Sequence, residues 1–163
     1  ATLAPVIIGA PILLLSRRIG QVIDAIPASW LVALQLYRVF GSTFLIGWAY
    51  GAVPGIFAWP AGVGDTLTGL FAVPVAIALA SRTEDTRRAA VAWNIFGLAD
   101  FAIALSIGYA IAFHLIETGF ASATGGLYPT VMIPTIGVPS SILLHVLSLR
   151  QLSRRAKAAT ARA

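Results

Sequence analysis

The stretch AGVGDTLTGLFAVPVAIALASRTEDTRRAAVAWNIFGLADFAIALSIGYAIAFHL, residues 61–115, decides the fold of this chain. It contains two apolar runs, residues 61–80 and 89–115, and each is as long as the ~20 residues that a helix needs to cross a bilayer. A compact charged loop, residues 82–88, separates the two runs. The stretch therefore predicts two membrane-spanning helices joined by a loop in water.

The composition of the whole chain agrees with this prediction. Of its 163 residues, 58% are hydrophobic and only 10% are charged, and the mean hydropathy is +0.88. A soluble domain carries about 25% charged residues, so the missing polar surface implies lipid as the solvent. The chain has no cysteine, which excludes disulfides, zinc–thiolate sites and thiol chemistry.

Three further apolar stretches extend the pattern to about five spans. We predict an all-α integral membrane helix bundle in one transmembrane domain, residues 1–149, followed by a basic tail, residues 150–163. The three stretches are residues 1–15 (either a truncated span or one that extends through residues 19–26), residues 29–50 and residues 127–149.

The arginines predict the orientation of this bundle. Ten of the 11 basic residues fall at three places that five spans put on one side of the membrane. By the positive-inside rule, that side is cytoplasmic, the N-terminus is outside and the C-terminus is inside. Because these residues serve as topology signals, the net charge of +5 does not indicate a nucleic-acid partner. The ten residues are Arg17, Arg18, Arg82, Arg87, Arg88, Arg150, Arg154, Arg155, Lys157 and Arg162.

Prolines recur every five residues in the last predicted span, at Pro129, Pro134 and Pro139. An interior proline frees a carbonyl and kinks a helix, so we predict a kinked last span. Broken helices expose carbonyls to ions or substrates in transporters, although proline is also common in ordinary membrane helices.

Charged residues inside the spans are the candidate site. A charge at the bilayer centre costs about 2.5–3.5 kcal/mol on insertion scales, so Arg38, Asp65 and Asp100 are expected to face one another between helices. A rise of about 1.5 Å per residue predicts Arg38 paired with Asp100, and puts Asp65 nearer the outer face without a basic partner. Gln35, Asn94 and His145 are the predicted supporting residues.

Each of these polar groups has a structural explanation that stays open beside the functional one. Arg38 and Asp100 can form an ion pair that only fixes helix packing, with Asn94 and Gln35 as hydrogen-bond partners between helices. Asp65 can carry a proton or bind a cation, but it can also cap the start of its helix, since Asp is a favourable N-cap.

A glycine pattern, Gly47, Gly51 and Gly55, ends the second predicted span. Small residues at this spacing allow two helices to approach closely in a membrane. The pattern therefore predicts a helix-packing face, and with it a homo-oligomer or a subunit of a larger membrane complex.

The residues Gly62-Val63-Gly64-Asp65 match the GxGD signature of intramembrane aspartyl proteases such as presenilin and the prepilin peptidases. Their chemistry needs a second carboxylate close by, which in those families precedes the signature. Asp100 follows it, and Asp24 is predicted at the opposite membrane edge. We therefore expect no catalytic residue. An intramembrane hydrolase is kept as a third hypothesis, after the two functional hypotheses stated at the end of this subsection.

Two histidines raise the possibility of haem. His114 and His145 are predicted near opposite faces of the membrane, roughly 20 Å or more apart by helical rise, whereas a bis-His haem needs both rings on one iron. We therefore expect no cofactor and no metal, and predict that His145 forms hydrogen bonds at the cytoplasmic rim.

Several short motifs together resemble a group of small, uncharacterised bacterial multi-pass membrane proteins. The resemblance implies a protein of the bacterial cytoplasmic membrane in contact with lipid, and it implies no activity. The motifs are Tyr37-Arg38, Phe57-Ala58-Trp59-Pro60-Ala61-Gly62, Gly64-Asp65, Trp93-Asn94 with Gly97 and Asp100, Tyr128-Pro129, Ile133-Pro134 and Leu144-His145.

The leading functional hypothesis is a membrane-embedded binding or translocation unit for protons, a cation or a small molecule. It depends on the buried charges Arg38, Asp65 and Asp100. The alternative is a non-catalytic transmembrane subunit or homo-oligomer that makes its contacts through the glycine face.

Overall fold

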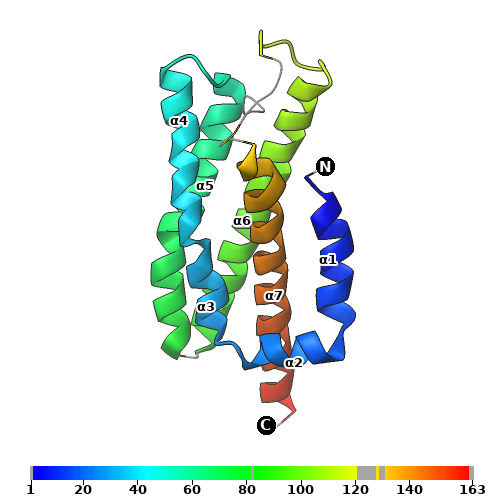
Figure 1. The fold of residues 1–163 in the computed structure, drawn as a ribbon. Helices are drawn as coiled ribbons and strands as arrows, with labels where there is room; N and C mark the ends of the chain where they lie inside the picture. Colours follow the sequence, from blue (N-terminus) through cyan, green and yellow to red (C-terminus); the bar gives the residue numbers. More distant parts are fainter. Residues whose placement is uncertain (1, 82, 121–127, 129–130, 162–163) are drawn as a thin grey trace.

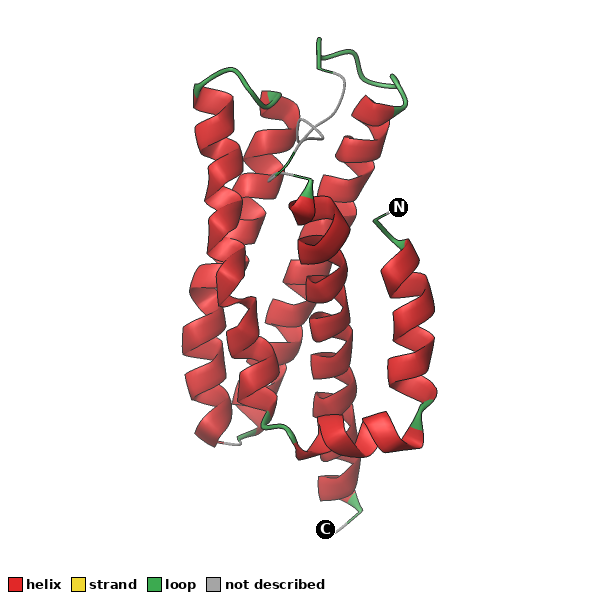
Figure 2. Cartoon of the chain, in the orientation of Figure 1, coloured by secondary structure: helices red, strands yellow, loops and turns green. Residues whose placement is uncertain are grey.

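The computed structural model describes residues 2–81, 83–120, 128 and 131–161, and every regular element in these residues is a helix (Figures 1 and 2). The long helices stand side by side as a bundle. In chain order the elements are α1 (Ala4–Leu15), α2 (Arg17–Ala25), α3 (Ala28–Ala33), η1 (Leu34–Gly41), α4 (Ser42–Ala49), α5 (Gly55–Ala78), η2 (Leu79–Ser81), α6 (Glu84–Ala112), η3 (Ile133–Gly137) and α7 (Val138–Thr160).

Four helical segments are long and apolar enough to cross a membrane: Ala28–Ala49, Gly55–Ser81, Glu84–Ala112 and Ile133–Ala158. Large apolar side chains point outward from them, among them Phe71, which is 56% exposed, and Ile95, which is 57% exposed. An apolar exterior around a polar interior is the arrangement that lipid favours. The fold is therefore compatible with a multi-pass membrane protein.

The predicted first span is not a single helix. α1 ends at Leu15 and α2 leaves it at an angle of 85°, so a fifth span exists only if the bent pair is counted as one. Ser16 makes the break, because its backbone is extended and its Oγ accepts a hydrogen bond from the Ile19 backbone N–H at 3.4 Å. With 12 residues, α1 is about 18 Å long, which is shorter than the hydrocarbon core of about 30 Å.

The second membrane-length segment changes its winding in the middle. α3 and α4 are α-helices, but η1 between them is a 3₁₀-helix of eight residues. A 3₁₀-helix has three residues per turn, so side chains three apart lie on one line. The buried residues follow this period: Val32, Gln35, Arg38, Gly41 and Phe44 all face the interior. The winding thus brings Gln35 and Arg38 onto the same inward line.

α5 begins six residues earlier than the sequence predicted. Pro54 precedes its first turn and Pro60 lies inside it, whereas the prediction began at Ala61. Asp65 therefore lies well inside the helix, and the interpretation of Asp65 as an N-cap is wrong.

The close approach of α5 to η1 depends on glycine. A Cβ at Gly69 would come within 2.5 Å of the Val39 backbone nitrogen, and a Cβ at Gly41 would overlap the Asp65 side chain.

The predicted glycine face is not a helix face. α4 ends at Ala49, and Gly51 lies in the following turn with a φ of +69°. Gly47 lies against Val53, and Gly55 opens α5 against Trp48. The three glycines therefore shape the α4–α5 turn, because the chain reverses before the pattern can form a stripe.

α7 continues past the predicted end of the last span. It runs to Thr160, so the first part of the expected basic tail is helical, and Gln151 and Leu152 within it are buried. At the other end, the π-helical turn η3 contains Pro134, and Pro139 lies in the first turn of α7. Irregular winding thus occurs at Pro134, whereas Pro129 lies outside the described residues.

Candidate functional site

Arg38 lies at the centre of the bundle and binds two carboxylates. Its Nη2 donates to Asp100 Oδ2 on α6 at 2.6 Å, and its Nε donates to Asp65 Oδ1 on α5 at 2.7 Å. The predicted Arg38–Asp100 pair is therefore confirmed. The prediction that Asp65 has no basic partner is wrong, because the earlier start of α5 brings Asp65 to the level of Arg38. We refer to Arg38, Asp65, Asp100 and His145 as the ion cluster.

The geometry of the cluster determines the proton position on His145. Arg38 Nη1 lies 2.9 Å from His145 Nε2, and a guanidinium can only donate. His145 Nε2 must therefore accept, and the ring proton lies on Nδ1, which donates to Asn94 Oδ1 at 2.9 Å. His145 is thus neutral. It is fully buried in mid-bundle, so its predicted position at the cytoplasmic rim is wrong, since α7 extends further than expected.

The supporting residues tie the helices together. Asn94 Nδ2 donates to Ser148 Oγ on α7 at 3.1 Å. Gln35 Nε2 donates to the Ser141 carbonyl at 2.9 Å, and Ser141 Oγ donates to Gln35 Oε1 at 2.8 Å. Gln35 and Asn94 therefore form the hydrogen bonds between helices that were predicted for them. Asn94 also orients His145, whereas Gln35 anchors η1 beside the cluster.

Sequence reasoning missed the aromatic groups of the site. The Phe101 ring lies under the Arg38 guanidinium, with Cζ 3.9 Å from the ring centroid, a distance at which cation–π attraction is appreciable. The Trp93 and His145 rings are 5.1 Å apart, and Trp93 Nε1 donates to the Thr68 carbonyl. Tyr37 donates to the Gly137 carbonyl at 2.8 Å and also contacts Ser141.

Three glycines make room for the charged side chains. A Cβ at Gly41 would overlap Asp65, one at Gly64 would overlap Asp100, and one at Gly97 would overlap His145 and lie 2.8 Å from Arg38 Nη1. A signal was present in the sequence, since Gly41 follows Arg38 by three residues, Gly64 precedes Asp65, and Gly97 precedes Asp100 by three. Residues three apart lie on one face of a helix, so this spacing places Gly41 beside Arg38 and Gly97 beside Asp100, whereas Gly64 does not share a face with Asp65.

The cluster holds one more acidic than basic charge when both carboxylates are ionised. Arg38 is the single cation, and its side chain is 1% exposed, while those of Asp100 and Asp65 are 6% and 13% exposed. An uncompensated charge in low dielectric is costly. The arrangement therefore favours the uptake of one proton or one cation, and Asp65 is its most accessible member.

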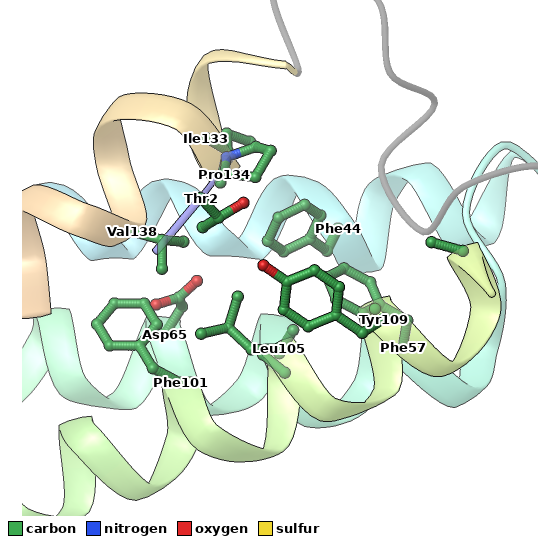
Figure 3. A pocket seen from close by; sticks show the side chains of 14 residues that line it. Thr2, Phe44, Phe57, Asp65, Phe101, Leu105, Tyr109, Ile133, Pro134 and Val138 are labelled. Carbon is green, nitrogen blue, oxygen red and sulfur yellow. The ribbon is translucent and has the colours of Figure 1, made fainter. Parts of the chain in front are cut away.

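Two cavities meet at Asp65. The larger has a volume of about 590 Å³ and the smaller about 190 Å³. Both are walled by η3 and the start of α7 on one side and by the helices around the cluster on the other. Figure 3 shows the smaller cavity, with the Asp65 carboxylate between Phe101 and Val138. The residues that line both cavities are Phe44, Asp65, Phe101, Ile133 and Val138.

Other residues singled out in the sequence lie apart from this site. His114 follows α6 in a turn with a φ of 54°, so it does not face His145. Asp24 forms an exposed pair with Arg154 at 2.5 Å and is no partner for Asp65. Asp65 and Asp100 each accept a hydrogen bond from Arg38, whereas the two carboxylates of an aspartyl protease share a proton with each other. In the described part of the chain, no three His, Cys, Asp or Glu residues are grouped to hold a metal.

The fold and the ion cluster define an all-helical protein whose membrane-length helices enclose buried charge. The chain belongs to the family described as Domain of unknown function (DUF8737), whose model matches residues 2–153. No curated protein and no solved structure matches it. A family of unknown function over most of the chain is consistent with the resemblance to an uncharacterised group, and it does not bear on the bacterial and membrane parts of that resemblance.

Proposed function

We propose that this protein is a membrane-embedded unit that binds, and can translocate, a cation or a proton at Asp65. The observation that carries the proposal is the position of Asp65. Its carboxylate belongs to a buried cluster with one excess acidic charge, and it also lines both cavities. A carboxylate placed in this way is the usual design of an intramembrane cation or proton site.

The two carboxylates have different roles in this proposal. Asp100 is the more buried and accepts from Arg38 at 2.6 Å, so Arg38 holds it ionised. Asp65 shares the same guanidinium but faces the cavities, where it takes up the cation or proton. His145 stays neutral because it accepts from Arg38. Among the described residues that line the cavities, the other titratable groups are the phenols of Tyr37 and Tyr109.

We further propose insertion in the cytoplasmic membrane of a bacterium, with the C-terminus inside. The arrangement of the basic residues supports this orientation. α2 with Arg17 and Arg18, the start of α6 with Arg87 and Arg88, and the basic end of α7 gather at one end of the bundle (Figure 1). A single basic end is what the positive-inside rule requires of a cytoplasmic face.

The test is flux into liposomes that contain the purified protein. A pH-sensitive dye inside the vesicles reports proton movement on imposing a potential, and a panel of external cations is screened in the same vesicles. We expect Asp65→Asn to abolish the flux, because it removes the group that carries the charge. Asp24→Asn is the matched control, since it neutralises an exposed carboxylate away from the cavities. Equal flux in wild type and Asp65→Asn would contradict the proposal.

A further inference from the structure

The walls of the cavities indicate which kind of cation belongs there. Building on the proposed function, we propose that the ligand is a small organic monocation with an apolar body, such as an aromatic ammonium, with its charged head at Asp65. The charge of the ion cluster, the lining of the cavities and the volume of the cavities support this proposal.

The charge of the cluster selects a cation over an anion. Among the described residues that line the cavities, Arg38 carries the one guanidinium, and its Nε, Nη1 and Nη2 already bind Asp65, His145 and Asp100. Its plane is also stacked on Phe101. An anion would therefore have to displace internal partners, whereas a cation compensates the excess acidic charge. Among the described residues, Asp65 Oδ2 accepts no hydrogen bond, so this oxygen is available to a ligand.

The cavity walls select an organic cation over an inorganic one. A bare metal cation needs about six oxygen ligands. The smaller cavity offers Asp65 together with the hydroxyls of Tyr109 and Thr2. In the larger one, the side-chain oxygens besides those of Asp65 are the hydroxyls of Tyr37, Thr43 and Ser141. Among the described lining residues, neither cavity by itself thus supplies six side-chain oxygens for a dehydrated metal ion, whereas an ammonium needs only the carboxylate.

The same walls fit an apolar body. Aromatic rings attract quaternary ammonium groups and pack against flat hydrocarbon, and Phe101 already holds the Arg38 cation on one face. The volume of about 590 Å³ falls in the range of about 300–1,000 Å³ that is typical of small-molecule pockets. The rings lining one or both cavities are Phe40, Phe44, Phe57, Phe101, Tyr37 and Tyr109.

The inference is tested with two probes of similar size and opposite charge. Phenyltrimethylammonium and benzenesulfonate are titrated by calorimetry into the protein in lipid nanodiscs. We expect phenyltrimethylammonium to bind with one site per chain and benzenesulfonate to give no saturable heat. Asp65→Asn should weaken the binding of the cation at least about tenfold, because it removes a desolvated charge partner. Asp65→Glu should retain binding, and Asp24→Asn should match the wild type.

A second variant keeps the test informative if Asp65→Asn does not fold. Ile133 lines both cavities and lies outside the ion cluster, so Ile133→Trp fills the space and leaves the charges intact. We expect this variant also to lose phenyltrimethylammonium. Equal binding of both probes, or binding of the cation that neither variant weakens, would overturn the inference.

The outcomes separate this inference from the proposed function. If phenyltrimethylammonium does not bind but flux still depends on Asp65, the proposed function stands and the inference is wrong. If the cation binds at Asp65 but no flux is found, the inference stands and the unit binds without translocating. If neither binding nor flux depends on Asp65, both are wrong.

Discussion

Two carboxylate–guanidinium pairs of nearly equal length have opposite surroundings in this molecule. Arg38 and Asp100 are 2.6 Å apart and almost fully buried, whereas Arg154 and Asp24 are 2.5 Å apart with side chains 54% and 37% exposed. An exposed pair contributes about 0–1 kcal/mol, but removing one partner of a buried pair costs about 3–5 kcal/mol. Because the two distances are nearly equal, the surroundings of a pair decide how much it contributes to stability.

Removing the shared cation should have the largest effect. Arg38→Met leaves Asp65 and Asp100 buried without a guanidinium, and we expect a loss of about 3–5 kcal/mol in the free energy of unfolding. Thermal unfolding in detergent, followed by the helical circular dichroism signal, measures it. Arg154→Met is the matched control at the exposed pair. Equal unfolding temperatures for the two variants would show that burial does not distinguish the pairs.

Neutralising the carboxylates one at a time and together should be strongly non-additive. Asp65→Asn alone or Asp100→Asn alone leaves one acidic and one basic charge, so each should change the stability by less than about 1.5 kcal/mol. The double variant leaves Arg38 unpaired in the core and should lose about 3–5 kcal/mol. A double-mutant cycle in the same unfolding assay gives the coupling energy, and a value near zero would contradict the shared-guanidinium geometry.

Crowding the ion cluster with an added methyl group should lower the free energy of unfolding by less than the double carboxylate variant does. Gly64→Ala introduces a Cβ that overlaps Asp100, and overpacking costs about 1–3 kcal/mol. Gly108→Ala is the control on another helix, because its Cβ would lie 3.7 Å from Phe57, an ordinary contact. The control should be neutral or gain up to about 1 kcal/mol of helix propensity. Similar losses in both variants would mean that Gly64 is not needed for the position of Asp100.

The smallest effect is expected at the exposed pair. Asp24→Asn should lower the free energy of unfolding by less than about 1 kcal/mol, and the difference should shrink as salt is added, because water and ions screen the interaction. Unfolding at low and high salt measures both quantities. A loss as large as that of Arg38→Met would remove the contrast between the two pairs.

The sequence contained enough to predict the helices and the Arg38–Asp100 pair. Long apolar runs identify the helices, and the high cost of buried charge requires the pair. It did not predict the level of Asp65, because this depends on whether α5 begins after Pro54 or after Pro60, and the intervening residues are apolar in either case. Nor did it predict the break at Ser16, since the residues on either side are compatible with a continuous helix.

The cavities were beyond prediction for a different reason. They depend on how η3 and α7 stand against α4 and α6, which is decided by contacts between residues far apart in the chain. Tyr37 and Ser141 contact each other although they are 104 positions apart in the chain. No pattern in the sequence around either residue predicts this contact. The three-residue spacing of Gln35, Arg38 and Gly41 can be seen in the sequence. Only the 3₁₀ winding of η1 shows that this spacing places the three residues on one line.

The 3₁₀ winding of η1 makes the second membrane-length segment longer and more tightly wound than a uniform α-helix of the same number of residues. A 3₁₀-helix rises about 2.0 Å per residue against about 1.5 Å in an α-helix. The eight residues of η1 therefore lengthen the segment by about 4 Å relative to a uniform α-helix. They also turn α4 by about 160° relative to α3, since each residue advances about 120° instead of about 100°. A return of η1 to α-helical winding would shorten the segment, rotate α4 relative to α3 and draw Arg38 out of line with Asp65 and Asp100. The length of this segment and the direction that α4 faces are thus coupled to the position of Arg38 in the middle of the bundle.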